Sequence, residues 1–167
     1  LVLGGARSGK SRFAEKTASD SQLKVTYIAT ATVYDDEMQA RINRHISDRP
    51  QHWLTIEEPL NLAQTLKEQA KEGTCLLVDC LTLWLTNVLM AEQDQAAGSE
   101  SAITSLTEYK EELLSVLSSL PGSVILVSNE VGQGIVPMGE LSRRFVDEAG
   151  WLHQDIARIA QQVTLVV

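Results

Sequence analysis

The octapeptide GGARSGKS, at 4–11, constrains this chain more than any other stretch of its sequence. It follows a short apolar run, LVL at 1–3, and leads into a helical pattern at 10–20, so it lies where a strand passes into a helix. In that setting G-x-x-x-x-G-K-S is typical of a phosphate-binding loop, whose backbone N–H groups turn toward phosphate oxygens at a helix N-terminus. Lys10 is predicted to reach the β- and γ-phosphates, and the Ser11 hydroxyl to hold Mg²⁺. The predicted nucleotide contacts are Gly4, Gly5, Ala6, Arg7, Ser8, Gly9, Lys10 and Ser11.

Short β-branched apolar runs alternate with longer helical patterns along the chain. Pro59 is predicted to be a first helical residue and Gly73 to follow the end of a helix. Strands joined through single helices pair in parallel. The predicted fold is therefore α/β, a P-loop NTPase-type (RecA-like) single domain over 1–167, with a mostly parallel sheet and helices on both faces. We predict strands at 1–3, 24–30, 75–80, 123–129 and 163–167, and helices at 10–20, 35–47, 59–72, 82–93, 101–119 and 139–161.

The composition limits the partners and the location that we expect. The 167 residues carry a formal net charge of -8, which disfavours binding to nucleic acid or to acidic membranes. No apolar run has the length of a membrane span. Cys75 and Cys80 would point to opposite faces of one strand, which excludes a disulfide between them. Two unpaired thiols predict a reducing, cytoplasmic location.

An aspartate, Asp79, ends the buried apolar run CLLVD. In a domain with a phosphate loop, a carboxylate at this place is predicted to hold Mg²⁺. The alternative is an aspartate that caps the next helix. A Ras-like GTPase is disfavoured, because SNEVG stands where N-K-x-D is expected and DCLT does not continue as D-x-x-G.

A histidine, His45, stands in the charged segment DDEMQARINRHISDRP. Counted as a helix at about 100° per residue, this segment puts His45 on one face with Met38, Arg41 and Ile42. Cations beside an imidazole favour its neutral form, which keeps a lone pair available near pH 7. The residue could therefore act as a nucleophile. From periodicity alone, a packed or solvated histidine is the favoured interpretation.

Five stretches in fixed order carry a resemblance: GGARSGKS, YIAT, DDEMQARINRHISDRPQHWLTIEEP, DCLTLWLTN and SNEVGQGIVP. With them the chain resembles, from Leu3 to about Val163, the bifunctional adenosylcobinamide kinase / adenosylcobinamide-phosphate guanylyltransferase family of cobalamin biosynthesis. In that family the histidine of R-I-x-x-H-x-x-x-R-P is guanylylated, and this position is His45 here. Some relatives have two adjacent histidines, whereas this chain has Arg44 before His45. The resemblance also implies nucleotide contacts at Thr30, Ala31, Thr32, Ile46, Ser47, Asp48, Arg49 and Glu57, with Asp79 as the acid that binds the metal.

The resemblance implies two reactions. With Mg²⁺, ATP or GTP phosphorylates the aminopropanol hydroxyl of adenosylcobinamide. His45 then takes GMP from GTP and passes it to adenosylcobinamide phosphate, and the Glu57 carboxylate accepts from guanine N1–H and N2–H₂. From helix geometry alone, we predict that Arg41 and Arg49 stabilise the transferring phosphoryl group. By resemblance the partners are adenosylcobinamide and its phosphate, and the protein is a homotrimer.

Some alternatives stay open at this level. The chain could be a monofunctional P-loop kinase for another small metabolite, or a GTP-binding regulator without catalysis. The apolar, glycine-rich stretch 129–137 is predicted to cover the corrinoid, to line the nucleotide site or to form a subunit contact. Arg143 and Arg144 either meet the cobinamide phosphate or face solvent. His52 and His153 are weaker candidates for chemistry, and His52 is expected to pack with its neighbour Trp53.

Overall fold

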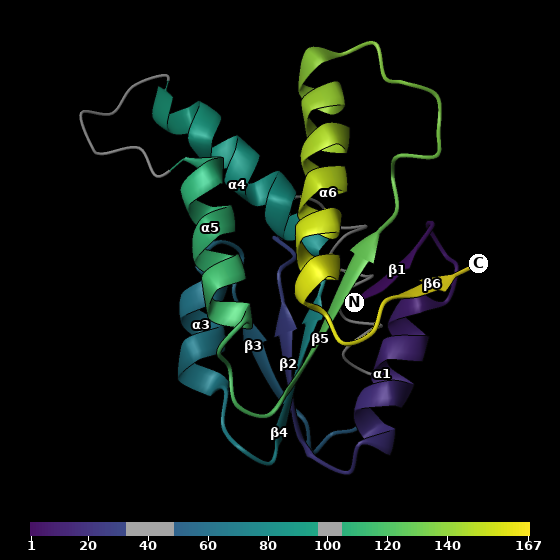
Figure 1. Ribbon diagram of the computed structural model, residues 1–167, viewed down its shortest axis with the longest axis vertical. Coiled ribbons are helices and arrows are strands. Elements are labelled where there is room, and N and C mark those ends of the chain that lie inside the picture. The colour runs from purple at the N-terminus through teal and green to yellow at the C-terminus, as the bar shows by residue number, and fades with distance from the viewer. Residues whose placement is uncertain (33–48, 97–104) are drawn as a thin grey trace.

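Six parallel strands of the described chain form one sheet, with all their carboxyl ends along the same edge (Figure 1). The fold is that of a computed structural model, which describes residues 1–32, 49–96 and 105–167. Across the sheet the order is β3-β2-β4-β5-β1-β6, and every neighbouring pair is parallel. The strands are β1 (Val2–Gly4), β2 (Lys24–Ala29), β3 (Leu54–Glu57), β4 (Thr74–Asp79), β5 (Ser123–Asn129) and β6 (Thr164–Val166).

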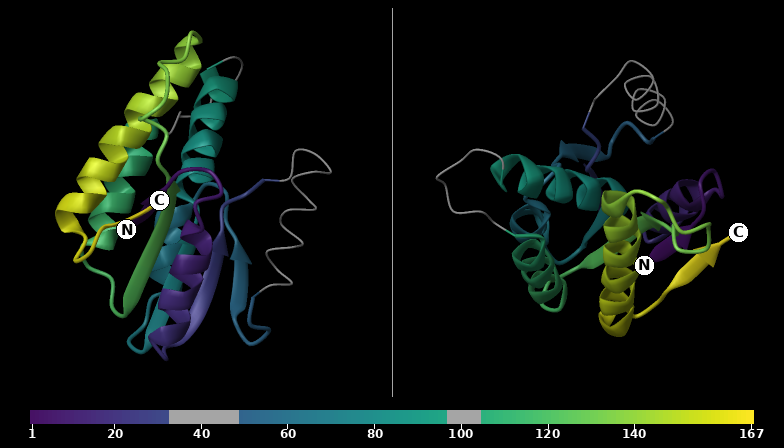
Figure 2. Two further views of the ribbon diagram at one scale, coloured as in Figure 1. Left: turned by 90° about the vertical axis from the view of Figure 1, so that its right-hand side faces the viewer. Right: turned by 90° about the horizontal axis from the view of Figure 1, so that it is seen from above.

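Helices cover both faces of this sheet, which confirms the predicted α/β class (Figure 2). One face carries α1, and the other carries α3, α4, α5 and α6. The central strands are therefore buried on both sides, which explains why they are apolar throughout. The helices are α1 (Lys10–Asp20), α3 (Leu62–Gln69), α4 (Leu81–Ala96), α5 (Leu106–Leu117) and α6 (Glu140–Ile159).

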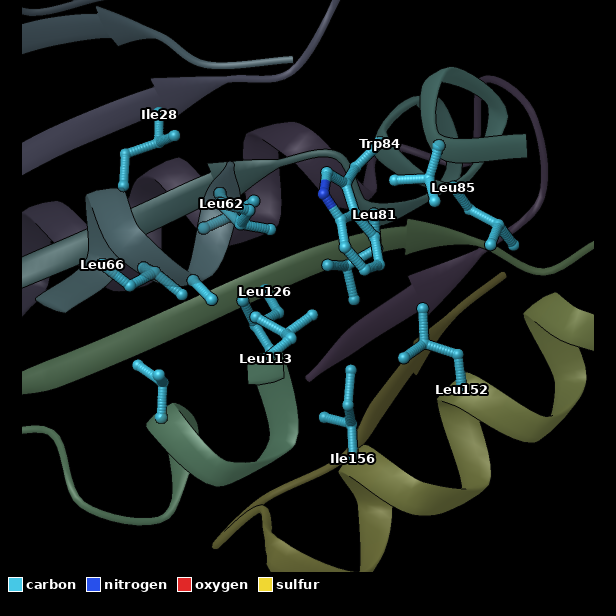
Figure 3. Packing of buried hydrophobic residues seen from close by; sticks show 14 of the residues in the cluster. Ile28, Leu62, Leu66, Leu81, Trp84, Leu85, Leu113, Leu126, Leu152 and Ile156 are labelled. Atoms are coloured by element: carbon cyan, nitrogen blue, oxygen red, sulfur yellow. The ribbon is translucent and has the colours of Figure 1, made fainter. Parts of the chain in front are cut away.

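The strand alternation produces two buried clusters. On the α1 face, Tyr27 and Val127 pack with the small helix residues Ala14 and Ala18. The opposite face holds the larger cluster, in which the fully buried Trp84 lies among leucines and isoleucines of the sheet and of the four helices (Figure 3). Each fully buried large side chain of this kind contributes about 1.5–3 kcal/mol of hydrophobic stabilisation. The Trp84 indole N–H also donates to the Leu60 carbonyl at 2.8 Å, so its polar atom is satisfied.

The predicted strands are confirmed to within a residue or two, but β3 was not predicted. It pairs with β2 as an edge strand, with Ile56 opposite Ile28. The prediction of a helix from Pro59 is wrong, because α3 begins at Leu62 with Asn61 as its N-cap. Before it, a Glu58 carboxylate oxygen accepts from the N–H groups of Leu60 and Asn61, at 2.9 and 2.7 Å, and holds a turn in place of a helical start.

Two other helix predictions have different outcomes. The helix predicted at 101–119 is confirmed as α5, which begins later, at Leu106. Its N-cap is Ser105, whose hydroxyl accepts from the Glu108 N–H while the Glu108 carboxylate accepts from the Ser105 N–H. The helix predicted at 35–47 lies outside the described residues.

Both cysteines are buried free thiols, so the prediction that they form no disulfide with each other is confirmed. The predicted placement on opposite faces is wrong. Cys75 and Cys80 belong to the same buried cluster on the α1 face. Strand β4 ends at Asp79, so the alternation of a strand does not extend to Cys80. Among the described residues, no helix is long and apolar enough to cross a membrane.

Candidate functional site

The carboxyl edge of the sheet collects most of the predicted site residues that the structure describes. Parallel pairing places Ala29 opposite both Asp79 and Glu57, and it places Gly4 opposite Asn129. In open α/β sheets, ligands bind in the crevice outside the carboxyl ends of the strands. This edge is therefore the candidate active site.

The phosphate loop (residues 4–11) connects β1 to α1 as the sequence predicts. Within it the Ser8 N–H donates to the Gly5 carbonyl at 3.3 Å, and Arg7 and Gly9 have positive φ values of 60° and 92°. Gly9 is the N-cap of α1, and no side chain forms a cap hydrogen bond there. The N–H groups of the first helical turn are thus available to an anion at the positive end of the helix.

Lys10 and Gly4 show how tightly this loop is built. Lys10 is buried, and its Nζ donates to the Gly5 carbonyl at 3.2 Å, so the ammonium already lies over the loop. A Cβ added to Gly4 would lie 2.5 Å from Ser8 Oγ and 2.6 Å from the Val166 carbonyl. Glycine is therefore required where the loop leaves β1 between its neighbours. Ser8 Oγ is buried and has no hydrogen-bond partner within the described ranges.

Asp79 ends β4, which is separated from β1 by the single strand β5. At strand spacings of about 4.8 Å, two steps put the end of β4 about 10 Å from the strand that bears the phosphate loop. Asp79 Oδ2 accepts a hydrogen bond from the Tyr27 hydroxyl at 2.9 Å. Burial, together with the negative charge of Asp79, raises the pKa of Tyr27 far above its usual range, so the phenol stays protonated and donates.

These residues fit a magnesium ion bound together with a nucleotide. Mg²⁺ keeps several waters and takes one or two carboxylates plus substrate phosphates, rather than a cage made only of protein. Ser11 lies in the first turn of α1 and Asp79 is only partly buried, which leaves one hydroxyl and one carboxylate for this purpose. Over residues 1–32, 49–96 and 105–167 there is no cluster of three or more His, Cys, Asp or Glu that could hold a metal without a nucleotide.

Thr30 follows β2 and is buried, with its polar groups engaged inside the protein. Its hydroxyl donates to the Cys80 carbonyl at 2.6 Å and accepts from the Cys80 N–H at 2.9 Å. The buried Asn87 of α4 donates to the Thr30 carbonyl at 2.8 Å. Thr30 therefore joins the ends of β2 and β4, while Ala31 and Thr32, both half-buried, continue from this anchor at the carboxyl edge.

Glu57 is exposed at the carboxyl end of β3, at the opposite side of the sheet from the phosphate loop. Four strand steps of about 4.8 Å put it about 19 Å from β1. Its backbone lies beside the end of β2, where Ala29 is its partner in the ladder. The candidate site therefore extends along most of the carboxyl edge.

Arg49 is buried, with 8% of its surface exposed, and its guanidinium carbon lies 3.4 Å from the centre of the Tyr27 ring. One terminal nitrogen is 3.5 Å from Thr55 Oγ1, a long hydrogen bond. Its Nε is buried without a hydrogen-bond partner in the described part of the chain. Arg49 was predicted to contact the nucleotide, and the structure places it against Tyr27, which in turn contacts Asp79.

The remaining candidates have varied outcomes. Arg143 donates to the carbonyls of Pro137 and Met138, and Arg144 pairs with Glu92 of α4 at 2.6 Å. Both arginines are exposed, as one of the two alternatives predicts, and their guanidinium groups also make these contacts within the protein. His52 is exposed, which contradicts its expected packing beside the buried Trp53. The predicted site residues Arg41, His45, Ile46, Ser47 and Asp48 lie outside the described residues.

The sequence analysis assigned no individual role to two residues of this site. Tyr27 was read only as an apolar strand residue, and its contact with Asp79 joins positions 52 apart in the chain. Asn129 ends β5 between Gly4 and the end of β4, and its amide Oδ1 is buried with no partner among the residues described. A polar residue at the carboxyl end of a buried strand is a signal that could have found Asn129.

Comparison with known proteins finds relatives along the whole chain. The whole chain, 1–167, matches the model of the family described as cobinamide kinase / cobinamide phosphate guanyltransferase. It is 58% identical over 167 residues to the bifunctional adenosylcobalamin biosynthesis protein CobP of Pseudomonas aeruginosa. The aligned region covers 100% of this chain and 91% of that protein. It is 40% identical over 171 residues to the bifunctional adenosylcobalamin biosynthesis protein CobU of Escherichia coli, with coverage of 100% and 94%.

Two solved structures share the fold. One is an ATPase from the type III secretion system of pathogenic bacteria, with a TM-score of 0.57 and 12% identity over 99% of this chain and 50% of that chain. The other is the assembled ATPase EscN of enteropathogenic E. coli, with a TM-score of 0.52 and 11% identity over 98% and 42%. This chain spans half or less of their length, and the similarity supports the P-loop ATPase fold alone.

Proposed function

The chain belongs to the cobinamide kinase / cobinamide phosphate guanyltransferase family, and we propose that the residues of its carboxyl edge divide the two reactions of that family between them. It is a bifunctional enzyme of cobalamin biosynthesis, a kinase and a guanylyltransferase. The observation that carries the proposal is the placement of the phosphate loop, Asp79 and Glu57 at the ends of parallel strands of one sheet.

In the kinase reaction the phosphate loop binds the β- and γ-phosphates of ATP or GTP. Lys10 exchanges its contact with the Gly5 carbonyl for phosphate oxygens, and Ser11 and Asp79 hold Mg²⁺. When bound, the ion neutralises charge that develops on the phosphate oxygens. The aminopropanol hydroxyl of adenosylcobinamide attacks the γ-phosphorus, and the nucleoside diphosphate leaves. The N–H groups of the first α1 turn support this role, because no side chain caps them and a helix N-terminus favours an anion.

In the guanylyltransferase reaction a His45 ring nitrogen attacks the α-phosphorus of GTP, and pyrophosphate leaves. A phosphate oxygen of adenosylcobinamide phosphate then attacks the same phosphorus, which restores the histidine and gives adenosylcobinamide-GDP. Each half is an easier displacement than a single direct transfer. Glu57 supports guanine recognition, because its exposed carboxylate accepts hydrogen bonds and adenine offers no N1–H and N2–H₂ pair. The segment Thr30–Thr32 directly follows β2, the strand next to β3, and so lies at the same edge.

We also propose a homotrimer in the cytoplasm. Two buried free thiols support a reducing location. A subunit contact through 129–137 and the residues after it is supported by Ile135 and Met138, which are 98% and 96% exposed.

The test is a trapping experiment with GTP labelled at the α- or the γ-phosphate. After denaturation, wild-type protein is expected to retain only the α-label, in a bond that is labile to acid and stable to alkali. His45→Ala should retain none. His52→Ala is the matched control, because His52 is exposed and lies seven positions away, and it should retain the label of the wild type. Absence of α-label in wild-type protein that binds GTP would contradict the histidine intermediate.

A further inference from the structure

Tyr27 lies on the α1 face of β2 and makes two contacts with different parts of the site. Only 3% of its surface is exposed. Its hydroxyl donates to Asp79 Oδ2 at 2.9 Å, across from β2 to the end of β4. Its ring lies under the guanidinium of Arg49, whose central carbon is 3.4 Å from the ring centre. One buried side chain therefore contacts both the proposed metal ligand and a residue of the segment expected to bind nucleotide.

The hydroxyl contact restricts Asp79. A carboxylate with one oxygen hydrogen-bonded to a rigid, buried phenol has a fixed orientation, and only its other oxygen remains to be turned toward a bound cation or its water. The Tyr27 ring is itself held by the cluster of the α1 face, so it cannot follow a rotating carboxylate. This geometry orients Asp79 before the nucleotide arrives.

The ring contact restricts Arg49. This residue is the first described position after the segment 33–48, which contains His45. A planar guanidinium that stacks on an aromatic ring in a buried place is held both by cation–π attraction and by packing. Arg49, four positions after His45 in the sequence, is therefore packed on the same tyrosine that contacts Asp79.

We propose that Tyr27 is a positioning residue for both reactions. Its hydroxyl orients Asp79 for the kinase step, and its ring anchors Arg49, which follows His45 by four positions in the sequence, for the guanylyltransferase step. The inference rests on the proposed roles of Asp79 and His45. Its tests therefore distinguish a wrong role for Tyr27 from a wrong role for Asp79 or His45.

The hydroxyl is tested with Tyr27→Phe, which keeps the ring under Arg49. The measurement is calorimetric binding of the β,γ-imido analogue of ATP with and without Mg²⁺, which needs no turnover. Mg²⁺ should increase the affinity for the analogue about 10-fold less in this variant than in the wild type. Without Mg²⁺, the two proteins should bind the analogue equally well. Tyr109→Phe is the matched control, because Tyr109 is a partly buried tyrosine of α5 on the opposite face, and it should behave as wild type.

The ring is tested with Arg49→Lys, which keeps the charge but loses the planar stack. We expect the rate of single-turnover trapping of α-labelled GMP to fall about 10-fold, because a small misplacement of a reacting group slows a reaction by such a factor. The Mg²⁺ dependence of analogue binding should be unchanged. Tyr27→Phe should trap GMP at the wild-type rate. A merely structural role would instead impair both readouts together, in proportion to lost stability, and that result would overturn the proposal.

Two reference variants, Asp79→Ala and His45→Ala, show which proposed role is wrong when a test fails. If Asp79→Ala loses the Mg²⁺ dependence and Tyr27→Phe keeps it, the positioning role of the hydroxyl is wrong while the metal role of Asp79 stands. If Asp79→Ala also keeps it, the proposed metal ligand is wrong, and the kinase half of the inference falls with it. If Arg49→Lys traps GMP at the wild-type rate while His45→Ala traps none, the anchoring role of the ring is wrong.

Discussion

His153 is buried in α6, and its Nε2 lies 2.7 Å from Ser128 Oγ of β5. The same serine hydroxyl is 3.1 Å from Thr82 Oγ1, which accepts from the Asn129 N–H at 2.7 Å. A chain of hydrogen bonds therefore runs from α6 to the end of β5 beside the phosphate loop. Burial lowers the pKa of His153, and the nearby Glu130 carboxylate opposes this shift only in part.

A lowered pKa in the folded state means that the unfolded chain binds more protons on acidification. The contribution of His153 to the free energy of unfolding is thus fully present above about pH 6.5, the usual histidine pKa, and is lost as the pH falls below it. We expect His153→Gln, which does not titrate, to flatten this part of the stability profile. The check is urea unfolding of both proteins from pH 8 to pH 5. A constant difference between the two proteins over that range would show that His153 does not titrate on unfolding.

At the residue scale, the sequence is informative where a motif fixes both spacing and context. Lys10 and Ser11 follow from the phosphate-loop pattern, and Asp79 follows from its place at the end of a buried run. Tyr27 and Arg49 could not be paired in advance. Alternation places Tyr27 on a face of the sheet, but its contact with Asp79 depends on the neighbouring strand in the sheet, which one sequence does not specify.

At the scale of elements, the turn before β5 depends on a single glycine. Gly122 has a φ of 77°, and a Cβ there would lie 2.5 Å from the Lys71 carbonyl and 2.6 Å from the Thr74 carbonyl. Gly73, in the turn before β4, has the same φ, but an added Cβ would meet nothing within 4 Å. The two positions share a backbone conformation and differ in their surroundings.

We therefore expect Gly73→Ala to lower the free energy of unfolding by about 1–2 kcal/mol, the cost of a left-handed non-glycine residue. Gly122→Ala should lower it by clearly more, because the methyl group also collides with two backbone oxygens. Urea denaturation of the pair measures the difference directly. Equal losses would mean that the turn shifts to make room for the methyl group.

The missed and shifted elements have physical reasons. Strand β3 is a four-residue edge strand with mostly exposed side chains, so it lacks the apolar run that identifies the central strands. It forms because β2 offers it a parallel partner, which is tertiary information. The start of α5, in contrast, was readable. Ser105 and Glu108 in SLTE form a capping box, which is a sequence signature of a helix N-terminus.

At the scale of the whole molecule, two clusters share one sheet. Trp53 lies in the cluster on the α1 face and Trp84 in the cluster on the other, while Trp151 is 54% exposed. Because β2, β4 and β5 each contribute side chains to both clusters, neither should persist when the other is lost. This expectation agrees with the predicted single domain.

The two buried tryptophans can report on the two faces separately. In Trp84→Phe the fluorescence change on unfolding comes chiefly from Trp53, and in Trp53→Phe it comes chiefly from Trp84. Within each variant, we expect the fluorescence transition to coincide with the transition in far-ultraviolet circular dichroism, as two-state unfolding requires. A fluorescence transition at lower urea than the loss of secondary structure, in either variant, would divide the molecule into two cooperative units.

The position of β1 has a consequence for how the protein is made. Val2 pairs with Val127 on one side and with Thr164 on the other, so the neighbours of the first strand come from the last third of the described chain. During synthesis, β1 and the phosphate loop leave the ribosome early, and β1 has no strand to pair with until β5 and β6 have been made. Such long-range pairing is slow. We therefore expect a nucleotide to bind only after the early steps of folding, once β5 and β6 have paired with β1.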